Sequence, residues 1–297
     1  TRSGIMNGAV LKGGALVIGY SVFIALADAI TKRVAEGFAA PQLFALSGLI
    51  VAALAMLTAR AVPRLGRVST GLPGLMLCRT VFTILAALFF FEAFQHLMFA
   101  EVFLYIALMP LIAALFAHPI LGERVTPFAW AALGIAFMAI VALCATGLET
   151  DLHGHLSGTA AALTGTLSML LARKMTRREP RILAQVFWPN LGLGLASLAM
   201  LPFVWRPMGL GDVAVFLGYG VLLFGARWLT VAALRLIPAH VATPLMNVQF
   251  IWMIGLGAVI WGEVPDPRII LGATIITAAG MMLLWADALT KPVSASA

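Results

Sequence analysis

Ionisable side chains lie inside segments that are otherwise apolar, and their positions suggest binding of charged solutes or transfer of protons. With the topology predicted below, the acids Asp28, Glu92 and Glu101 lie towards the outside, and the bases Arg79 and Arg227 lie towards the inside. In hydrocarbon a charged side chain costs at least roughly 2.5 kcal/mol unless it is paired or hydrated. We therefore expect these groups to face an internal polar space, where carboxylates bind cations or exchange protons and guanidinium groups bind carboxylates.

Glu101 is the strongest candidate among the acids. Its neighbours include Phe99 and Phe103, and Pro110 interrupts the same segment. Apolar surroundings raise the pKa of a carboxyl group, which suits proton coupling. The same carboxylate could instead attract an ammonium-bearing substrate, or it could cap the start of its helix.

The remaining ionisable residues have competing roles. Asp28 and Glu92 are further candidates for proton coupling, but each lies within a turn or so of water and could pair with Lys32 or Arg33. Arg227 lies deep in its segment, where a guanidinium needs a structural partner or a substrate carboxylate.

Arg79 and His240 are weaker candidates. Arg79 is close enough to the aqueous end to extend its side chain to water. His240 begins a segment, which favours a role at the helix start.

Polar and aromatic residues form a second set that could line the internal space. Amide side chains must hydrogen-bond inside the bundle and can bind a zwitterion without a fixed charge. Pro244 and Pro110 weaken the two segments that we expect to form the floor of a site. Trp252 is the best candidate for a cation–π contact. The predicted substrate-binding residues are Glu101, Tyr105, Trp188, Asn190, Arg227, Asn247, Gln249 and Trp252.

The composition requires that this space lie in a membrane. The chain has 297 residues, of which 62% are hydrophobic and 10% are charged, whereas soluble domains have roughly 25% charged residues. The excess apolar surface must face lipid. This excludes a soluble enzyme, a disordered chain and, despite the net charge of +7, a nucleic-acid-binding protein. Cys78 and Cys144 lie in separate apolar segments, which favours small buried side chains over a disulfide or a zinc site.

A window of about 20 residues predicts membrane-spanning helices along the whole chain. The segments are 13–31, 38–59, 72–94, 98–117, 128–146, 156–172, 182–204, 211–234, 239–261 and 269–286. With a cytoplasmic N-terminus, 13 of the 19 Lys and Arg residues fall in cytoplasmic loops and four fall outside, namely Lys32, Arg33, Arg206 and Arg268. The positive-inside rule therefore places both termini in the cytoplasm.

The two halves of the chain resemble each other. Gly122-Glu123 and Gly262-Glu263 end the fourth and ninth predicted helices, 140 residues apart. We therefore predict two repeats, residues 1–147 and 148–297, and because each has five helices the second must be inverted in the membrane. The repeated glutamates favour a structural role over gating.

Several motifs resemble a known family. They are Ala27-Asp28-Ala29-Ile30-Thr31-Lys32, Ala100-Glu101, Leu121-Gly122-Glu123-Arg124-Val125 and Gly262-Glu263-Val264-Pro265-Asp266. Together with the two five-helix repeats, they resemble EamA-type members of the drug/metabolite transporter superfamily over essentially the whole chain. The resemblance implies an all-α membrane protein of ten helices around a central cavity, lined mainly by helices 1, 3, 4, 6, 8 and 9.

These features predict a secondary transporter in the bacterial inner membrane. It would move a small polar organic solute (amino-acid-like, amine-bearing or nucleoside-like) by alternating access, with a coupled proton as one option and no cofactor or metal. A monomer and a homodimer both stay open. A membrane enzyme acting on lipid is an alternative, but it would need clustered His, Asp or Glu, and only His153 and His155 lie close together, near Asp151, as a weak surface metal site. A channel is the third reading.

Overall fold

The computed structural model describes residues 2–62, 67–122, 130–131, 134–135, 138, 151–179, 181–234, 236, 246–272, 274–275 and 278. Within these ranges the chain is helical and contains no strand. The helices are α1 (Arg2–Ala35), α2 (Ala40–Ala61), α3 (Pro73–His96), α4 (Phe99–Leu121), α6 (Leu152–Arg178), α7 (Ile182–Val204), α8 (Leu210–Leu234) and α10 (Gln249–Leu256), which a π-helical turn (Gly257–Trp261) extends. The helix predicted at 182–204 has these bounds in the structure, and several others run a few residues longer than predicted.

Six of the described helices are long and apolar enough to cross a membrane: Leu11–Ala35 of α1, α2, α3, α4, α7 and Leu210–Thr230 of α8. Helix α6 is equally long but carries many Ser, Thr and Gly residues. Several of its hydroxyl groups bond within the helix or to α3: Thr164 and Thr166 donate to the carbonyls of Ala160 and Ala162, and Oγ of Ser168 lies 2.7 Å from Oγ1 of Thr83. The predicted helices 128–146 and 269–286, and the start of 239–261, lie largely outside the described residues.

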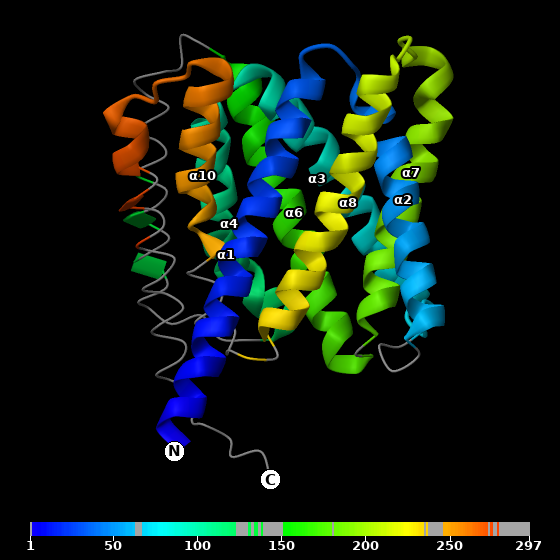
Figure 1. Cartoon of the computed structure of the whole chain (residues 1–297), viewed down its shortest axis with the longest axis vertical. Coiled ribbons are helices and arrows are strands. Elements are labelled where there is room, and N and C mark those ends of the chain that lie inside the picture. Colours follow the sequence, from blue (N-terminus) through cyan, green and yellow to red (C-terminus); the bar gives the residue numbers. More distant parts are fainter. Residues whose placement is uncertain are drawn as a thin grey trace.

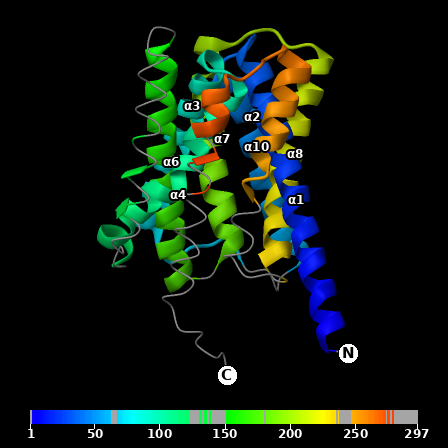
Figure 2. The same ribbon diagram turned by 90° about the vertical axis from the view of Figure 1, so that its left-hand side faces the viewer.

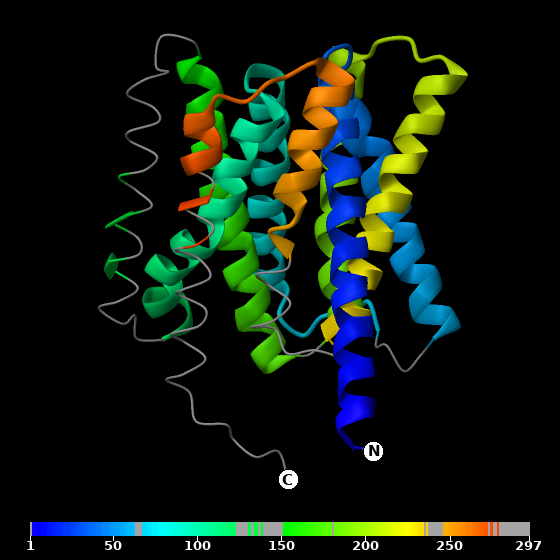
Figure 3. The same ribbon diagram turned by 60° about the vertical axis from the view of Figure 1, so that its left-hand side comes forward.

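The helices run roughly along one common direction (Figure 1). Helix α1 lies between α10 and α8 (Figures 1 and 3), and α2 packs against α7. Figure 2 shows α3, α4 and α6 together on the side away from α1 and α8.

The ends of α1 and α6 lie at opposite ends of the bundle. Lys32, near the end of α1, donates to the Leu97 carbonyl directly after α3. Glu179, directly after α6, accepts from the Gly71 amide before α3 begins. Helices α1 and α6, which start the two predicted halves, therefore run in opposite directions. We call the end that contains Lys32 and Leu97 the predicted outer end.

Side chains on the outward face of α3 are exposed. Leu77 and Val81 are 65% and 46% exposed, and Cys78 is exposed as well. The expectation that Cys78 is buried is therefore wrong. An apolar environment for this thiol comes from lipid around the helix rather than from protein. Cys144 lies outside the described residues.

The repeated glycines end their helices in the same way. Gly122 after α4 and Gly262 after α10 and its π-helical turn have φ of 72° and 66°, the left-handed conformation that closes helices and favours glycine. This gives the repeated glycine a backbone role at the end of each helix. Glu123 lies outside the described residues, as do His240 and Pro244.

Backbone contact between α2 and α7 occurs at Gly48. A Cβ atom added there would lie 2.7 Å from the Asn190 carbonyl oxygen and 2.8 Å from the Gly194 nitrogen. We expect Gly48→Ala to lower the free energy of unfolding by about 1–3 kcal/mol, because the two backbones must separate. Thermal unfolding in detergent measures this. Gly218→Ala in α8 is the matched control, since nothing lies within 4 Å of its added Cβ atom; equal melting temperatures for the two variants would contradict the prediction.

Candidate functional site

A carboxylate–amide pair joins α1 to α10. Nε2 of Gln249 donates to Oδ2 of Asp28 over 2.7 Å. Asp28 stands among small buried residues, Ala25, Ala27 and Ala29, which allow the start of α10 to approach this face of α1. Gln249 is 6% exposed and Asp28 is half-buried. The pair is therefore an internal polar contact between helices from the two predicted halves.

Two tyrosines and an arginine share this region. Helices α1 and α8 run antiparallel, because Gly225 faces the Phe23 ring and Gly19 faces Leu229. Tyr20 on α1 and Tyr219 on α8 each interact electrostatically with both Asp28 and Arg227. The Tyr219 side chain, 7% exposed, also forms a hydrogen bond with Thr31.

Arg227 lies on the inner side of this group. The α1–α8 pairing places it opposite Ser21, seven residues before Asp28, or about 10 Å along the helix axis. Nε1 of Trp252 donates to Oγ of Ser21 over 3.0 Å, so Trp252 lies at the same level. Within the described part of the chain, the half-buried Arg227 guanidinium forms no hydrogen bond or ion pair. We call Tyr20, Ser21, Asp28, Tyr219, Arg227, Gln249 and Trp252 the central polar site.

Four of these seven residues are predicted from the sequence, namely Asp28, Arg227, Gln249 and Trp252. The other three, Tyr20, Ser21 and Tyr219, are not. A spacing signal was present for the tyrosines. Tyr20 precedes Asp28 by eight residues, and Tyr219 precedes Arg227 by eight residues. Residues eight apart fall on one broad helix face.

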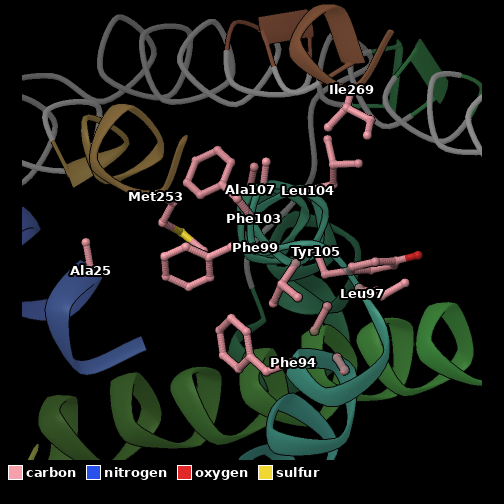
Figure 4. Packing of buried hydrophobic residues seen from close by; sticks show 14 of the residues in the cluster. Ala25, Phe94, Leu97, Phe99, Phe103, Leu104, Tyr105, Ala107, Met253 and Ile269 are labelled. Atoms are coloured by element: carbon pink, nitrogen blue, oxygen red, sulfur yellow. The ribbon is translucent and has the colours of Figure 1, made fainter. Parts of the chain in front are cut away.

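Glu101 and Tyr105 lie elsewhere, on α4. Oε2 of Glu101 accepts the Met98 amide over 2.9 Å, so its carboxylate caps the first turn of α4. The Tyr105 ring covers Gly158 of α6, and its hydroxyl lies 2.8 Å from Nδ1 of His155. Figure 4 shows Tyr105 on the opposite side of α4 from Met253.

The predicted residues of α7 bond to backbone carbonyls outside the central polar site. Nε1 of Trp188 donates to the Val68 carbonyl over 2.8 Å, and Nδ2 of Asn190 donates to the Val186 carbonyl within α7. Asn247 is half-buried in the turn before α10, where its carbonyl accepts the Phe250 amide.

Arg79 and Glu92, both on α3, also have protein partners. Arg79 donates to the Gln185 carbonyl of α7 instead of extending to water. Glu92 pairs with His96 and His153, and the alternative pairing of Asp28 or Glu92 with Lys32 or Arg33 is wrong. Lys32 forms an ion pair with Glu263 instead, and Arg33 forms one with Glu36.

The predicted outer end is closed by a buried ion pair. Nζ of Lys32 lies 2.5 Å from Oε1 of Glu263, and the two side chains are only 9% and 16% exposed. Lys32 also donates to the Leu97 carbonyl over 2.8 Å, and Oε2 of Glu263 accepts the Phe99 amide over 2.8 Å. We call the Lys32–Glu263 pair, with these two backbone bonds, the outer lock. It joins the ends of α1, α3 and α10 to the start of α4.

An apolar layer lies beneath the outer lock. Phe99 and Met253 are fully buried and belong to one cluster with Ala25, Ala29 and Phe103. Figure 4 shows Phe99 and Met253 side by side between α4 and α1. Asp28 is one turn from Lys32 on α1, so lock and layer together cover the central polar site on this side.

Glu101 offers a test of capping against proton coupling. We expect Glu101→Ala to lower the free energy of unfolding by about 1 kcal/mol, because the α4 cap is lost. Glu101→Gln keeps an acceptor oxygen for the Met98 amide, so a smaller loss and unchanged transport are expected. Melting in detergent and uptake into proteoliposomes at several pH values measure both. Loss of pH-dependent uptake in Glu101→Gln at an unchanged melting temperature would favour proton coupling instead.

Comparison with known proteins agrees with the helical architecture. One solved structure, described only as "Crystal structure of protein", superposes with a TM-score of 0.62 at 19% identity and covers 96% of this chain and 99% of its own. At that identity the likeness concerns the fold alone. No curated protein matches the sequence. The model of the EamA-like transporter family matches residues 11–145 and again 152–285, and the chain, a multi-pass membrane protein, therefore belongs to the EamA-like transporter family of the drug/metabolite transporter superfamily.

Proposed function

We propose that the protein is a secondary transporter for a small polar organic solute that carries an amine. The observation that carries this proposal is the Asp28–Gln249 pair inside the helical bundle. Gln249 is a neutral amide and does not neutralise Asp28, so the charge of the ionised carboxylate stays available for an ammonium group. Tyr20 and Tyr219 add hydroxyl groups, and Trp252 adds an aromatic face for the cation.

Arg227 extends the proposal to zwitterions. It supplies a positive charge about 10 Å along the helix axis from Asp28, and a guanidinium binds a carboxylate with two parallel hydrogen bonds. A solute with an amine at one end and a carboxylate at the other matches this order of charges. Amino-acid-like solutes of sufficient length are therefore favoured over nucleoside-like solutes, which lack the carboxylate.

The transport mechanism we propose is alternating access between two inverted five-helix halves, residues 1–147 and 148–297. The outer lock supports a state closed at the predicted outer end, and movement of α10 relative to α1 would open it. Asp28, rather than Glu101 or Glu92, is our candidate for proton coupling, since the other two carboxylates are engaged with backbone or histidine partners. The bacterial inner membrane, with both termini cytoplasmic, is the proposed location.

A ligand screen followed by a flux assay tests the function. Purified protein is melted in the presence of amines, zwitterions and anions of similar size, and the stabilising solutes are tested for counterflow in proteoliposomes. We expect stabilisation by amine-bearing solutes and saturable counterflow, which a channel does not show. Stabilisation by anions alone, or flux without saturation, would overturn the proposal.

A further inference from the structure

Outside the central polar site, metal-ligating side chains meet at the predicted outer end. Helix α3 contributes Glu92 and His96, one turn apart, and the start of α6 contributes Asp151 and His153. Nε2 of His153 lies 3.0 Å from Oε1 of Glu92, and Nε2 of His96 lies 3.4 Å from the same oxygen. The ligand atoms of Glu92, His96 and His153 all fall within 4.8 Å of one another.

These separations suit one metal ion. Around tetrahedral zinc with bonds of about 2.0–2.2 Å, ligand atoms stand roughly 3.3–3.5 Å apart. Two imidazole nitrogens and one carboxylate oxygen are the donors that zinc and related divalent metals prefer. The small movement needed to equalise the separations is available because Glu92, His96 and His153 are 39%, 34% and 63% exposed.

The hydrogen bond behind His96 strengthens the assignment. Nδ1 of His96 lies 2.7 Å from Oδ2 of Asp151, and this contact orients the ring so that Nε2 faces the Glu92 carboxylate. Nε2 is therefore the nitrogen of His96 that is placed to bind a metal ion together with Glu92. A carboxylate behind a ligating histidine is also the usual way to fix its ring in metal sites.

Asp151 is itself held in place by a second hydrogen bond. Its Oδ1 accepts the Gly154 amide over 3.0 Å, which caps the start of α6. The carboxylate is therefore fixed where its Oδ2 contacts Nδ1 of His96.

We propose that Glu92, His96 and His153 bind a divalent transition metal of the zinc class, with Asp151 positioning His96 and water completing the coordination. The ion would tie the end of α3 to the start of α6. His96 directly precedes Leu97, whose carbonyl accepts Lys32 of the outer lock, so bound metal would stiffen the closed outer end. The metal site is distinct from the central polar site and does not depend on which solute is carried.

Zinc titration of the full chain tests the proposal. The protein is purified in detergent, freed of any affinity tag, stripped with a chelator and titrated with zinc chloride in a calorimeter. We expect one zinc per chain, loss of that site in His153→Ala, and binding weakened about 10- to 100-fold in Asp151→Asn. His118→Ala, an exposed histidine near the other end of α4, is the matched control and should bind like the unchanged protein.

Spectroscopy separates metal binding from a purely ionic network. X-ray absorption of the zinc form should show two nitrogen ligands and one carboxylate oxygen at about 2.0–2.2 Å, and zinc should raise the melting temperature of the unchanged chain but not of His153→Ala. If the four side chains are only ion pairs, His153→Ala still lowers the melting temperature but no stoichiometric zinc binds. That result, or equal zinc binding by His153→Ala and His118→Ala, would overturn the proposal.

Discussion

The Asp28→Asn variant is expected to lose binding of the amine-bearing solute while it stays folded. Asparagine keeps an oxygen that accepts the Gln249 Nε2 hydrogen, so the contact between α1 and α10 survives. The negative charge is lost. A hydrogen bond to a charged group contributes about 1.5–3 kcal/mol, which corresponds to roughly 10- to 100-fold weaker binding.

Two measurements on Asp28→Asn, taken together, are informative. Ligand-induced shifts in melting temperature give the affinity, and counterflow gives the transport rate. Asp212→Asn is the matched control, because Asp212 lies at the start of α8, where it accepts the Gly209 amide. Unchanged affinity and counterflow in Asp28→Asn would remove the central polar site as the substrate site, even if the protein is a transporter.

Breaking the outer lock is expected to have the second large effect. Glu263→Gln keeps an acceptor for the Phe99 amide but removes the charge opposite Lys32. Loss of one partner from a buried ion pair costs about 3–5 kcal/mol, since the remaining charge stays buried. We expect the melting temperature to fall and the population open at the predicted outer end to rise.

The exposed pair Arg33–Glu36 is the control for this effect. Its side chains are 72% and 40% exposed, and such pairs contribute about 0–1 kcal/mol. Arg33→Met should therefore be nearly neutral. An effect of Glu263→Gln no larger than that of Arg33→Met would show that the lock does not hold the helices.

Opening of the predicted outer end can be measured separately from the stability of the fold. In a background with Cys78 and Cys144 replaced by serine, a cysteine introduced at Ala29 lies buried near the lock. A maleimide that does not cross membranes should label it faster in Glu263→Gln than in the parent. Equal labelling rates, with a lowered melting temperature, would assign the lock to stability alone.

The sequence predicted most helices well because each depends on a local property. A run of about 20 apolar residues must span or be buried wherever it occurs, and Pro and charged residues mark its ends. Ile182–Val204 has the predicted bounds. By contrast, α6 is more polar than the other long helices, and its hydroxyl groups bond partly within the helix and partly to α3.

Candidate residues were harder to sort because an acid in an apolar segment has several possible partners. Glu101 and Asp28 have similar surroundings in sequence, yet one accepts the Met98 amide three residues away and the other accepts from Gln249, 221 residues away. Only the first partner is visible locally. Asp28 therefore replaces Glu101 as the leading candidate only once its distant partner Gln249 is known.

By itself, the sequence determined that this is a multi-pass membrane protein with two similar halves, since composition, apolar run length and the repeated Gly-Glu motif need no knowledge of contacts. Tertiary structure decided which ionic groups meet. The outer lock joins residues 231 apart, and His153 of α6 meets Glu92 of α3 only because the two helices lie side by side. Ionic groups pair when they are close in space. Helix packing sets these distances, and it depends on side-chain shape over the whole bundle.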